Sequence, residues 1–169
     1  MSSRDSGYDL EEIIRRHADM VYRVAKLNTS QEKDAEDVFQ ETFLKLTKHI
    51  GTLKSEEHIK AWLLRVTING CKSHFASAWN KRVVVTEKEV LESYSDQGVG
   101  MYRNDANESV YEAVKSLPPK YRDIIHLFYF EELSIREISG ILKRSEGTVK
   151  SQLARGRERL SLILKDPLE

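Results

Sequence analysis

The chain has 169 residues, 32% of them charged, and no formal net charge at pH 7, a composition typical of folded globular proteins rather than of disordered ones. A net charge of zero argues against a protein that coats nucleic acid without selectivity. No apolar run has the length of a membrane span and no signal-peptide core is present, so we expect no membrane insertion and a cytoplasmic location. The single cysteine, Cys71, excludes an intrachain disulfide and is expected to be a small core residue.

A first helix is predicted to begin with Asp9 as its N-cap, and Glu12 completes the spacing of a capping box. Apolar residues recur every three or four positions from residue 10 to residue 27, which gives this helix one broad apolar face. His17 lies on that face. We interpret it as a core histidine, because no other potential ligand stands at metal-binding spacing from it.

A second helix is predicted after Thr29, which has capping-box spacing to Glu32. From Ala35 to Leu46 one face of this helix is apolar, and its other face is acidic and polar. Acidic residues near the start of a helix suit its dipole, so this pattern alone favours a solvated face with no further role.

A third helix is predicted to begin after Ser55, which lies in a polar loop at residues 51–57. Trp62 shares a seam with neighbouring apolar residues and is expected in the core. The later part of the helix mixes basic and aromatic residues, a composition suited to holding a phosphate backbone and stacking unpaired bases. The alternative is that Phe75 is a core residue and that the lysines simply face solvent.

Residues 83–107 lose helical periodicity and are predicted to form a flexible linker. Between Val83 and Glu112 there are seven acidic and two basic residues, a net charge of −5, so the linker is acidic. Within it, Val83–Val85 is a candidate short strand.

The C-terminal part is predicted to contain four helices. Asp105 or Asn107 caps the first, and Pro118-Pro119 ends it and starts the second. Residues 133–160 then have the pattern of a helix-turn-helix. Its capping signals are Ser134 with Glu137 for one helix and Ser145 for the next, whose seam is formed by Val149, Leu153, Gly156 and Leu160.

Two stretches, residues 60–82 and 134–165, each carry a net charge of +5, which predicts two contacts with nucleic acid. The sequence has no phosphate-cradling glycine-rich loop and no nucleophile–histidine set in a motif context. We therefore predict a protein that is not an enzyme and has no metal site or cofactor. The predicted fold is all-α, with an N-terminal bundle of three to four helices at 7–82, the linker at 83–107 and a helix-turn-helix domain at 108–166.

Four motifs occur in a characteristic order: DAEDVFQETF at 34–43, AWLLRV at 61–66 followed by Asn69 and Cys71, LPPKYR at 117–122 and EGTVKS at 146–151. Together they resemble the extracytoplasmic-function group of the sigma-70 family of bacterial RNA polymerase sigma factors, over nearly the whole chain from Tyr8 to Leu164. EGTVKS alone would be unspecific, because response regulators of the LuxR type carry a similar string. The first two motifs in succession are specific.

The resemblance implies a promoter-specificity subunit that binds core RNA polymerase and promoter DNA and is controlled by an anti-sigma factor. The acidic helix would dock on the clamp helices of the large polymerase subunit β′, through Asp37, Gln40 and Glu41. The loop at residues 51–57 and the third helix after it would recognise the −10 promoter element, and the candidate residues on the helix are Lys60, Arg65, Asn69, Lys72, His74 and Trp79. The helix-turn-helix would read the −35 element, through Thr148, Lys150, Ser151, Gln152, Arg155 and Arg157.

Three departures from the family pattern carry expectations. Ser73 and Ala76 stand where the family often has Asp and Arg, which affects the details of −10 contacts. Gln152 stands where Arg is common, and because Gln favours adenine and Arg favours guanine by ~1–3 kcal/mol, we expect an altered −35 preference. Lys143 replaces the usual turn glycine, so the turn is expected not to need a positive backbone angle there.

Two other functions fit parts of the pattern. One is a stand-alone helix-turn-helix regulator that binds a palindromic operator as a dimer. The other is a sigma-like decoy that binds polymerase or an anti-sigma factor without recognising a promoter.

Overall fold

The computed structural model describes residues 9–81 and 105–165, which form helices and, within those ranges, no strand. The chain divides into two compact units between Gln97 and Gly98. The predicted all-α fold is confirmed. The predicted linker and its candidate strand lie outside the described residues, except for residues 105–107, where the next helix begins.

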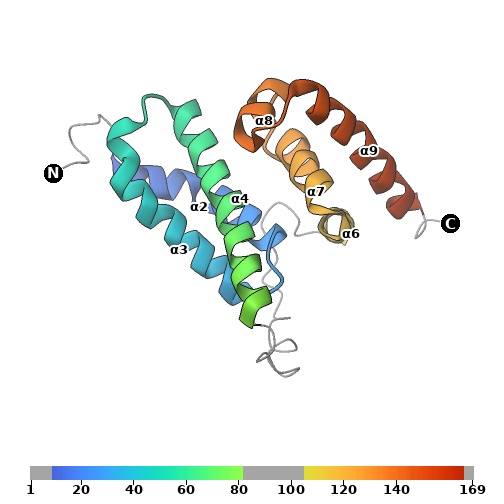
Figure 1. Ribbon diagram of the computed structural model, residues 1–169, viewed down its shortest axis with the longest axis horizontal. Coiled ribbons are helices and arrows are strands. Elements are labelled where there is room, and N and C mark those ends of the chain that lie inside the picture. Colours follow the sequence, from blue (N-terminus) through green and yellow to red (C-terminus); the bar gives the residue numbers. More distant parts are fainter. Residues whose placement is uncertain (1–8, 82–104, 166–169) are drawn as a thin grey trace. The chain divides into compact units, whose positions relative to one another are not determined.

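The N-terminal unit is a bundle of three helices, α2 (Leu10–Leu27), α3 (Glu32–His49) and α4 (Glu56–Lys81), shown in Figure 1. A short 3-10 turn, η1 (Ile50–Thr52), follows α3. Each of the three helices contacts the other two. Their apolar faces meet in a core whose largest fully buried side chains include Val21, Leu27, Leu46, Ile50, Ile59, Leu63 and Leu64.

The capping of α2 follows the prediction only in part. The Asp9 side chain accepts a hydrogen bond from the backbone N–H of Glu11, so Asp9 is the N-cap as expected. Glu12 instead forms an ion pair with Arg16 at 2.7 Å, one turn further along the helix.

The predicted N-cap of α3, Thr29, is wrong. The helix begins at Glu32, with Gln31 as an N-cap that makes no side-chain hydrogen bond. The Thr29 hydroxyl donates to the backbone oxygen of Ala25 at 2.8 Å, and the Asn28 amide donates to that of Val24 at 3.0 Å. Both side chains therefore bond to carbonyl groups at the end of α2. A Thr29 hydroxyl used in this way does not cap the start of α3.

The third helix begins where predicted, because the Ser55 side chain accepts a hydrogen bond from the backbone N–H of His58 at 3.0 Å. Trp62 is only partly buried and lies beside the His49 ring, so its predicted place in the core is wrong. Phe75 is 67% exposed, which also excludes it from the core. The buried positions on α4 belong instead to the aliphatic residues Ile59, Leu63, Leu64 and Ile68.

Helices α3 and α4 approach each other closely near Gly70. A Cβ atom at this position would stand 3.3 Å from Val38 Cγ1, so a larger residue would require the Val38 side chain to shift by a few tenths of an ångström. Cys71 is buried beside Ala25, Ala35 and Val38, which confirms its predicted place in the core.

His17 is buried in the N-terminal unit, as predicted for a core histidine. Its Nε2 atom lies 3.3 Å from Glu56 Oε2 on α4, and Arg16 pairs with the same carboxylate. Burial lowers the pKa of His17 below its ordinary value, although the hydrogen bond and charge of Glu56 act in the opposite direction.

This lowered pKa predicts that His17 destabilises the N-terminal unit in mild acid. Below the ordinary value of 6.5 the unfolded chain takes up a proton that the folded chain resists, so protonation favours unfolding. We expect the melting temperature of wild type to fall between pH 7.5 and pH 5 more steeply than that of His17→Gln. Equal pH slopes in the two proteins would contradict this role for His17.

The C-terminal unit contains α6 (Asp105–Ser116), α7 (Pro119–Ile125), a π-helical turn η4 (His126–Phe130), α8 (Ile135–Leu142) and α9 (Glu146–Lys165). Helix α9 packs against α6, α7 and α8. Its predicted seam is confirmed, with Val149, Leu153 and Gly156 buried and Leu160 partly buried. At Gly156 a Cβ atom would stand 3.0 Å from Ile125 Cγ1, so glycine permits the close contact with α7.

Both predicted caps of the helix-turn-helix are present. Ser134 and Glu137 form a capping box, with two hydrogen bonds of 3.1 Å. The Ser145 hydroxyl accepts a hydrogen bond from the backbone N–H of Thr148 at 3.1 Å.

The expectation for Lys143 is wrong, because its φ of 55° and ψ of 50° lie in the left-handed region. The chain must leave α8 and start α9 within three residues. The left-handed residue turns it so that the backbone N–H of Arg144 reaches the oxygen of Ser139 at 3.2 Å.

We expect Lys143→Gly to stabilise the C-terminal unit by up to about 1 kcal/mol. A side chain in the left-handed region costs roughly 1–2 kcal/mol, which the extra freedom of glycine in the unfolded chain offsets in part. Urea unfolding monitored by circular dichroism measures the difference. Lys143→Ala is the matched control: it removes the same charge but keeps a Cβ atom, and an equal gain in that variant would contradict the backbone explanation.

Candidate protein and nucleic-acid interfaces

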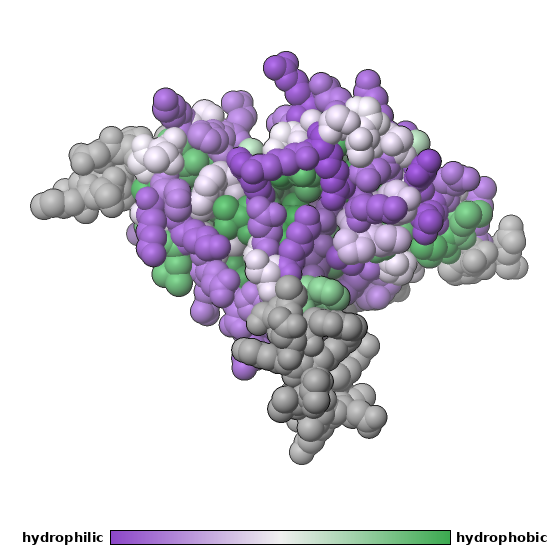
Figure 2. All heavy atoms as spheres, in the orientation of Figure 1, coloured by the Kyte–Doolittle hydropathy of each residue, from purple (hydrophilic) through white to green (hydrophobic). Residues whose placement is uncertain are grey.

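Each of the two helical units carries large apolar side chains that are exposed on its surface. Hydrophilic residues cover most of the face seen in Figure 2, with smaller apolar patches between them. Among the described residues the large exposed apolar side chains are Leu44, Phe75, Tyr129 and Leu162.

One face of α3 combines acidic, polar and apolar groups. Asp37, Gln40, Glu41 and Leu44 stand at i, i+3, i+4 and i+7, so they share one side of the helix. Gln40 and Glu41 are exposed, Asp37 is partly buried, and Leu44 is 64% exposed. An exposed leucine flanked by acidic groups suits a protein partner better than DNA, because a phosphate backbone repels the carboxylates.

Leu44 was not among the predicted site residues. Its signal in the sequence is its position, because it follows Asp37 by seven residues on the polar side of the helix while the neighbouring apolar residues Phe43 and Leu46 are buried. An apolar residue out of phase with the buried face therefore marked the surface.

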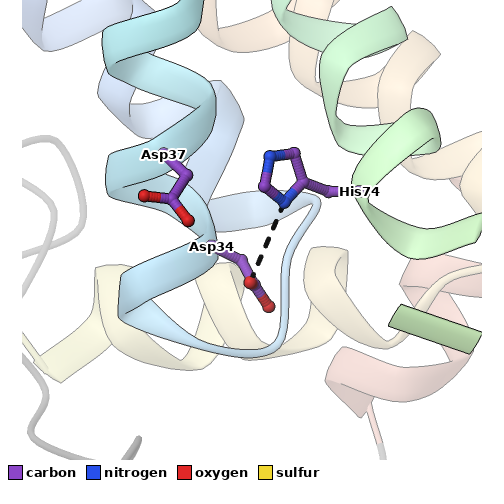
Figure 3. Close-up of side chains that lie close together, drawn as sticks. All are labelled: Asp34, Asp37 and His74. Atoms are coloured by element: carbon purple, nitrogen blue, oxygen red, sulfur yellow. Dashed lines mark ion pairs between the residues drawn. The ribbon is translucent and has the colours of Figure 1, made fainter. Parts of the chain in front are cut away.

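His74 of α4 lies against this acidic face of α3 (Figure 3). Its Nδ1 atom is 3.9 Å from Asp34 Oδ1, and its Nε2 atom is 3.4 Å from Glu41 Oε1. Potential ligand atoms of Asp34, Asp37 and His74 all lie within 4.8 Å of one another, so these three side chains could hold a metal ion. The structure thus brings His74 together with the predicted protein-binding residues.

The other −10 candidates on α4 divide between different faces. Arg65, Asn69 and Lys72 stand at i, i+4 and i+7 and therefore share one side of the helix. Among the predicted residues whose side chains are described, only these three lie on that side. Lys60 is rotated away from this group by about 140° at 3.6 residues per turn. The side chain of Trp79 lies outside the described residues.

Phe75 is the aromatic side chain that the predicted −10 residues omitted. It follows Lys72 by three residues and is largely exposed. An exposed aromatic next to basic and amide groups is the arrangement on which an unstacked base can rest. The mixture of basic and aromatic residues late in α4 was the available signal.

On α9 the predicted −35 residues also form two groups. Thr148, Lys150, Ser151 and Arg155 are exposed. Gln152 is partly buried, and its Oε1 atom accepts a hydrogen bond from Arg144 at 3.0 Å. The Arg157 guanidinium lies 5.5 Å from the ring centroids of both Phe128 and Tyr129, so it packs on the domain itself.

Three cations surround Tyr121 at the start of α7. Burial of this side chain disfavours its ionised form, but the charges of Lys120 and Arg159 and the hydrogen bonds from Arg155 and Lys120 hold the pKa of Tyr121 below its ordinary value. The Arg159 guanidinium also lies 5.0 Å from the centroid of the tyrosine ring. These contacts concentrate positive charge along one side of α9.

The fold and these surfaces define the class of the protein. One helical unit presents an acidic and apolar face, and the other presents a helix-turn-helix with an exposed basic helix, which is the architecture of a DNA-binding transcription factor. In the parts of the chain that the structure covers, no helix is both long enough and apolar enough to cross a membrane.

Family comparisons give the particular identity. The model of sigma-70 region 2 matches residues 13–81, and the model of sigma-70 region 4 matches residues 107–160. The chain belongs to the sigma-70 family of RNA polymerase sigma factors, in the extracytoplasmic-function (ECF) group.

The chain is 31% identical over 157 residues to the ECF RNA polymerase sigma factor SigE of Mycolicibacterium smegmatis, a match that covers 89% of this chain and 59% of that protein. It is 29% identical over 156 residues to the ECF RNA polymerase sigma factor SigM of Bacillus subtilis, covering 91% and 94% of the two chains. The fold is similar to that of the sigma factor RpoE of Bartonella quintana, solved in complex with the anti-sigma factor NepR, with a TM-score of 0.67, 23% identity and coverage of 93% and 97%.

Proposed function

We propose that this protein is a promoter-specificity subunit that binds core RNA polymerase, places its two helical units on the −10 and −35 elements and helps to start strand opening. The observation that supports the proposal is the presence, in one chain of the sigma-70 family, of an acidic face with an exposed leucine on α3 and an exposed basic face on α9. Residues 7–82 form the first functional domain, residues 108–166 the second, and residues 83–107 connect them.

The polymerase contact is assigned to Asp37, Gln40, Glu41 and Leu44. On binding the clamp helices of β′, Leu44 would lose its exposure to water, and the carboxylates would pair with basic groups around it. Apolar burial supplies affinity in this arrangement, and the charges supply orientation.

The −10 contact is assigned to α4. Arg65 and Lys72 would hold the phosphate backbone, Asn69 would offer an amide to a base edge, and Phe75 would stack on an unpaired base. Taking a base out of the helix costs a few kcal/mol, which stacking and hydrogen bonds on the protein can offset.

The −35 contact is assigned to the exposed residues Thr148, Lys150, Ser151 and Arg155 at the surface of α9. Gln152 has a different part. A guanidinium only donates hydrogen bonds, so the Gln152 atom that accepts from Arg144 is the side-chain carbonyl oxygen. Recognition of adenine by glutamine needs this same oxygen to accept from the adenine amino group. Reading adenine through Gln152 therefore requires the Arg144 contact to open.

The protein acts where RNA polymerase is found, in the cytoplasm, and contributes no catalytic step of its own. An anti-sigma factor that covers the polymerase-binding face would keep it inactive. The structural similarity to RpoE, which was solved with NepR, supports this mode of control.

Transcription in vitro with core polymerase tests the proposal against its rivals. Transcripts that start at defined sites only when the protein is added support it. Repression by the purified protein bound to duplex DNA supports an operator-binding regulator instead, and inhibition of core enzyme without new start sites supports a decoy.

A further inference from the structure

We propose that Asp34 and Asp37 of α3 and His74 of α4 form a binding site for a divalent transition-metal ion such as Zn²⁺. The site lies on the face of α3 to which we assign polymerase binding. The evidence for the site is the position of its three side chains, which does not depend on that assignment. Its ligands come from two helices, and their side chains lie close together (Figure 3).

The geometry of the three ligands is close to that of a coordinated ion. One potential ligand atom from each residue lies within 4.8 Å of the other two, and small side-chain rotations would bring them to the spacing around an ion with bonds of about 2 Å. All three side chains are partly buried in the folded chain. Binding an ion would therefore require less additional desolvation than it would for fully exposed side chains.

Glu41 supplies the orientation that metal-binding histidines usually have. Its carboxylate lies 3.4 Å from Nε2 of His74, where it can accept a hydrogen from the ring. In the tautomer with the hydrogen on Nε2, the other ring nitrogen, Nδ1, keeps a lone pair for a metal ion beside Asp34. A carboxylate behind a histidine that faces the metal is the recurrent arrangement that fixes the ring and raises its basicity.

The spacing between His74 and Asp34 leaves room for a cation. Nδ1 of His74 lies 3.9 Å from Asp34 Oδ1, beyond hydrogen-bond distance. Two bonds of about 2 Å to an ion between these atoms would span that separation.

The helices that carry the ligands are held firmly. Val38 of α3 packs against Gly70 of α4, where a Cβ atom added to the glycine would lie only 3.3 Å from Val38 Cγ1. Ala35 and Cys71 are buried in the same cluster as Val38. These contacts lie within about one helical turn of the ligands, so the helix spacing is set before an ion binds.

The ligand types select the metal. An imidazole nitrogen with two carboxylates suits Zn²⁺, Co²⁺, Ni²⁺ or Fe²⁺, whereas Mg²⁺ and Ca²⁺ prefer sites made of oxygen alone. Three protein ligands leave at least one coordination position for water or for a group from a partner protein.

Titration of the untagged full chain with Co²⁺ and Zn²⁺ tests the site. We expect one ion per chain, with visible Co²⁺ absorption bands that Zn²⁺ displaces, and loss of this binding in both His74→Ala and Asp34→Asn. Glu41→Ala should bind about 10–100 times more weakly, and Glu41→Gln, which keeps an acceptor for the ring hydrogen, should recover most of the affinity. Because Asp34→Asn keeps the shape of the side chain, it remains informative if His74→Ala unfolds.

His49→Ala is the control, since His49 is an exposed histidine on α3 outside the group. It should bind the metal as wild type does. Absence of saturable binding in wild type, or equal binding in His74→Ala and wild type, would overturn the site.

A consequence for regulation rests on the proposed function. An ion held by Asp37, with Glu41 behind it, would neutralise the face assigned to polymerase, so saturating Zn²⁺ should weaken core binding several-fold in wild type but not in His74→Ala. If wild type binds Zn²⁺ but never binds core polymerase, the proposed function fails and the metal site stands. If core binding is present and no Zn²⁺ binds, the metal site fails alone.

Discussion

Replacing His126 with leucine should lower the free energy of unfolding of the C-terminal unit by about 1–3 kcal/mol, the usual cost of removing a hydrogen-bond partner from a buried polar group. His126 is 1% exposed and Glu131 is 6% exposed, and His126 Nε2 lies 2.8 Å from Glu131 Oε2. The substitution keeps a side chain of similar apolar volume but removes this partner of a buried carboxylate. Urea unfolding followed by circular dichroism gives the change directly.

The pair lies at the point where the α-helical backbone of α7 changes to a π-helical turn. Between the two residues the chain forms the π-helical turn η4, closed by a hydrogen bond of 3.2 Å from the Glu131 backbone N–H to the His126 oxygen. The Phe130 ring stacks on the His126 ring at 5.6 Å. The side-chain contact and the turn therefore support each other, and loss of the pair should also loosen the entry into α8.

A double substitution separates the pair from the bulk of its side chains. Replacing both residues by leucine removes the polar groups together, and replacing both partners of a buried hydrogen bond by apolar groups can be nearly neutral. We expect His126→Leu with Glu131→Leu to regain most of the stability lost by His126→Leu alone. Losses that simply add would show that the two side chains do not act as a pair.

Local signals predicted the helices well because each depends on residues close in sequence. The Ser134–Glu137 capping box and the Ser145 cap each span four residues, and both are present. Thr29 failed as a cap because the unsatisfied carbonyls of the preceding helix offered its hydroxyl a nearer partner. The expectation for Lys143 failed because the packing of α8 against α9 keeps the left-handed turn even where glycine is replaced.

The candidate site was predicted less fully because it depends on side chains brought together by packing. His74 is 33 residues from Glu41 in the sequence, and no local pattern places its ring among the carboxylates of α3. Arg144 meets Gln152 across the turn between α8 and α9, which changes what Gln152 can offer a base. Leu44, in contrast, had a usable signal in its phase along the helix.

Asp37→Arg combined with Gln40→Ala should weaken the binding of core polymerase about a hundredfold or more. The exposed face of α3 joins Leu44 to acidic groups, so its partner must offer an apolar surface with basic groups around it. An arginine at position 37 would meet those basic groups at close range, and like charges across an interface cost several kcal/mol. Fluorescence titration of labelled protein with core polymerase, with no transition metal added, measures the loss.

Glu36→Arg is the matched control for this substitution. Glu36 is exposed on the same helix and the charge change is identical, but its side chain points roughly a quarter turn away from the Asp37–Leu44 face at 3.6 residues per turn. We expect this control to bind core polymerase within about threefold of wild type, because a charge at the rim of an interface has a small effect. An equal loss in both variants would mean that net charge, and not this face, governs the association. Undiminished binding by the double variant would remove α3 from the polymerase contact altogether.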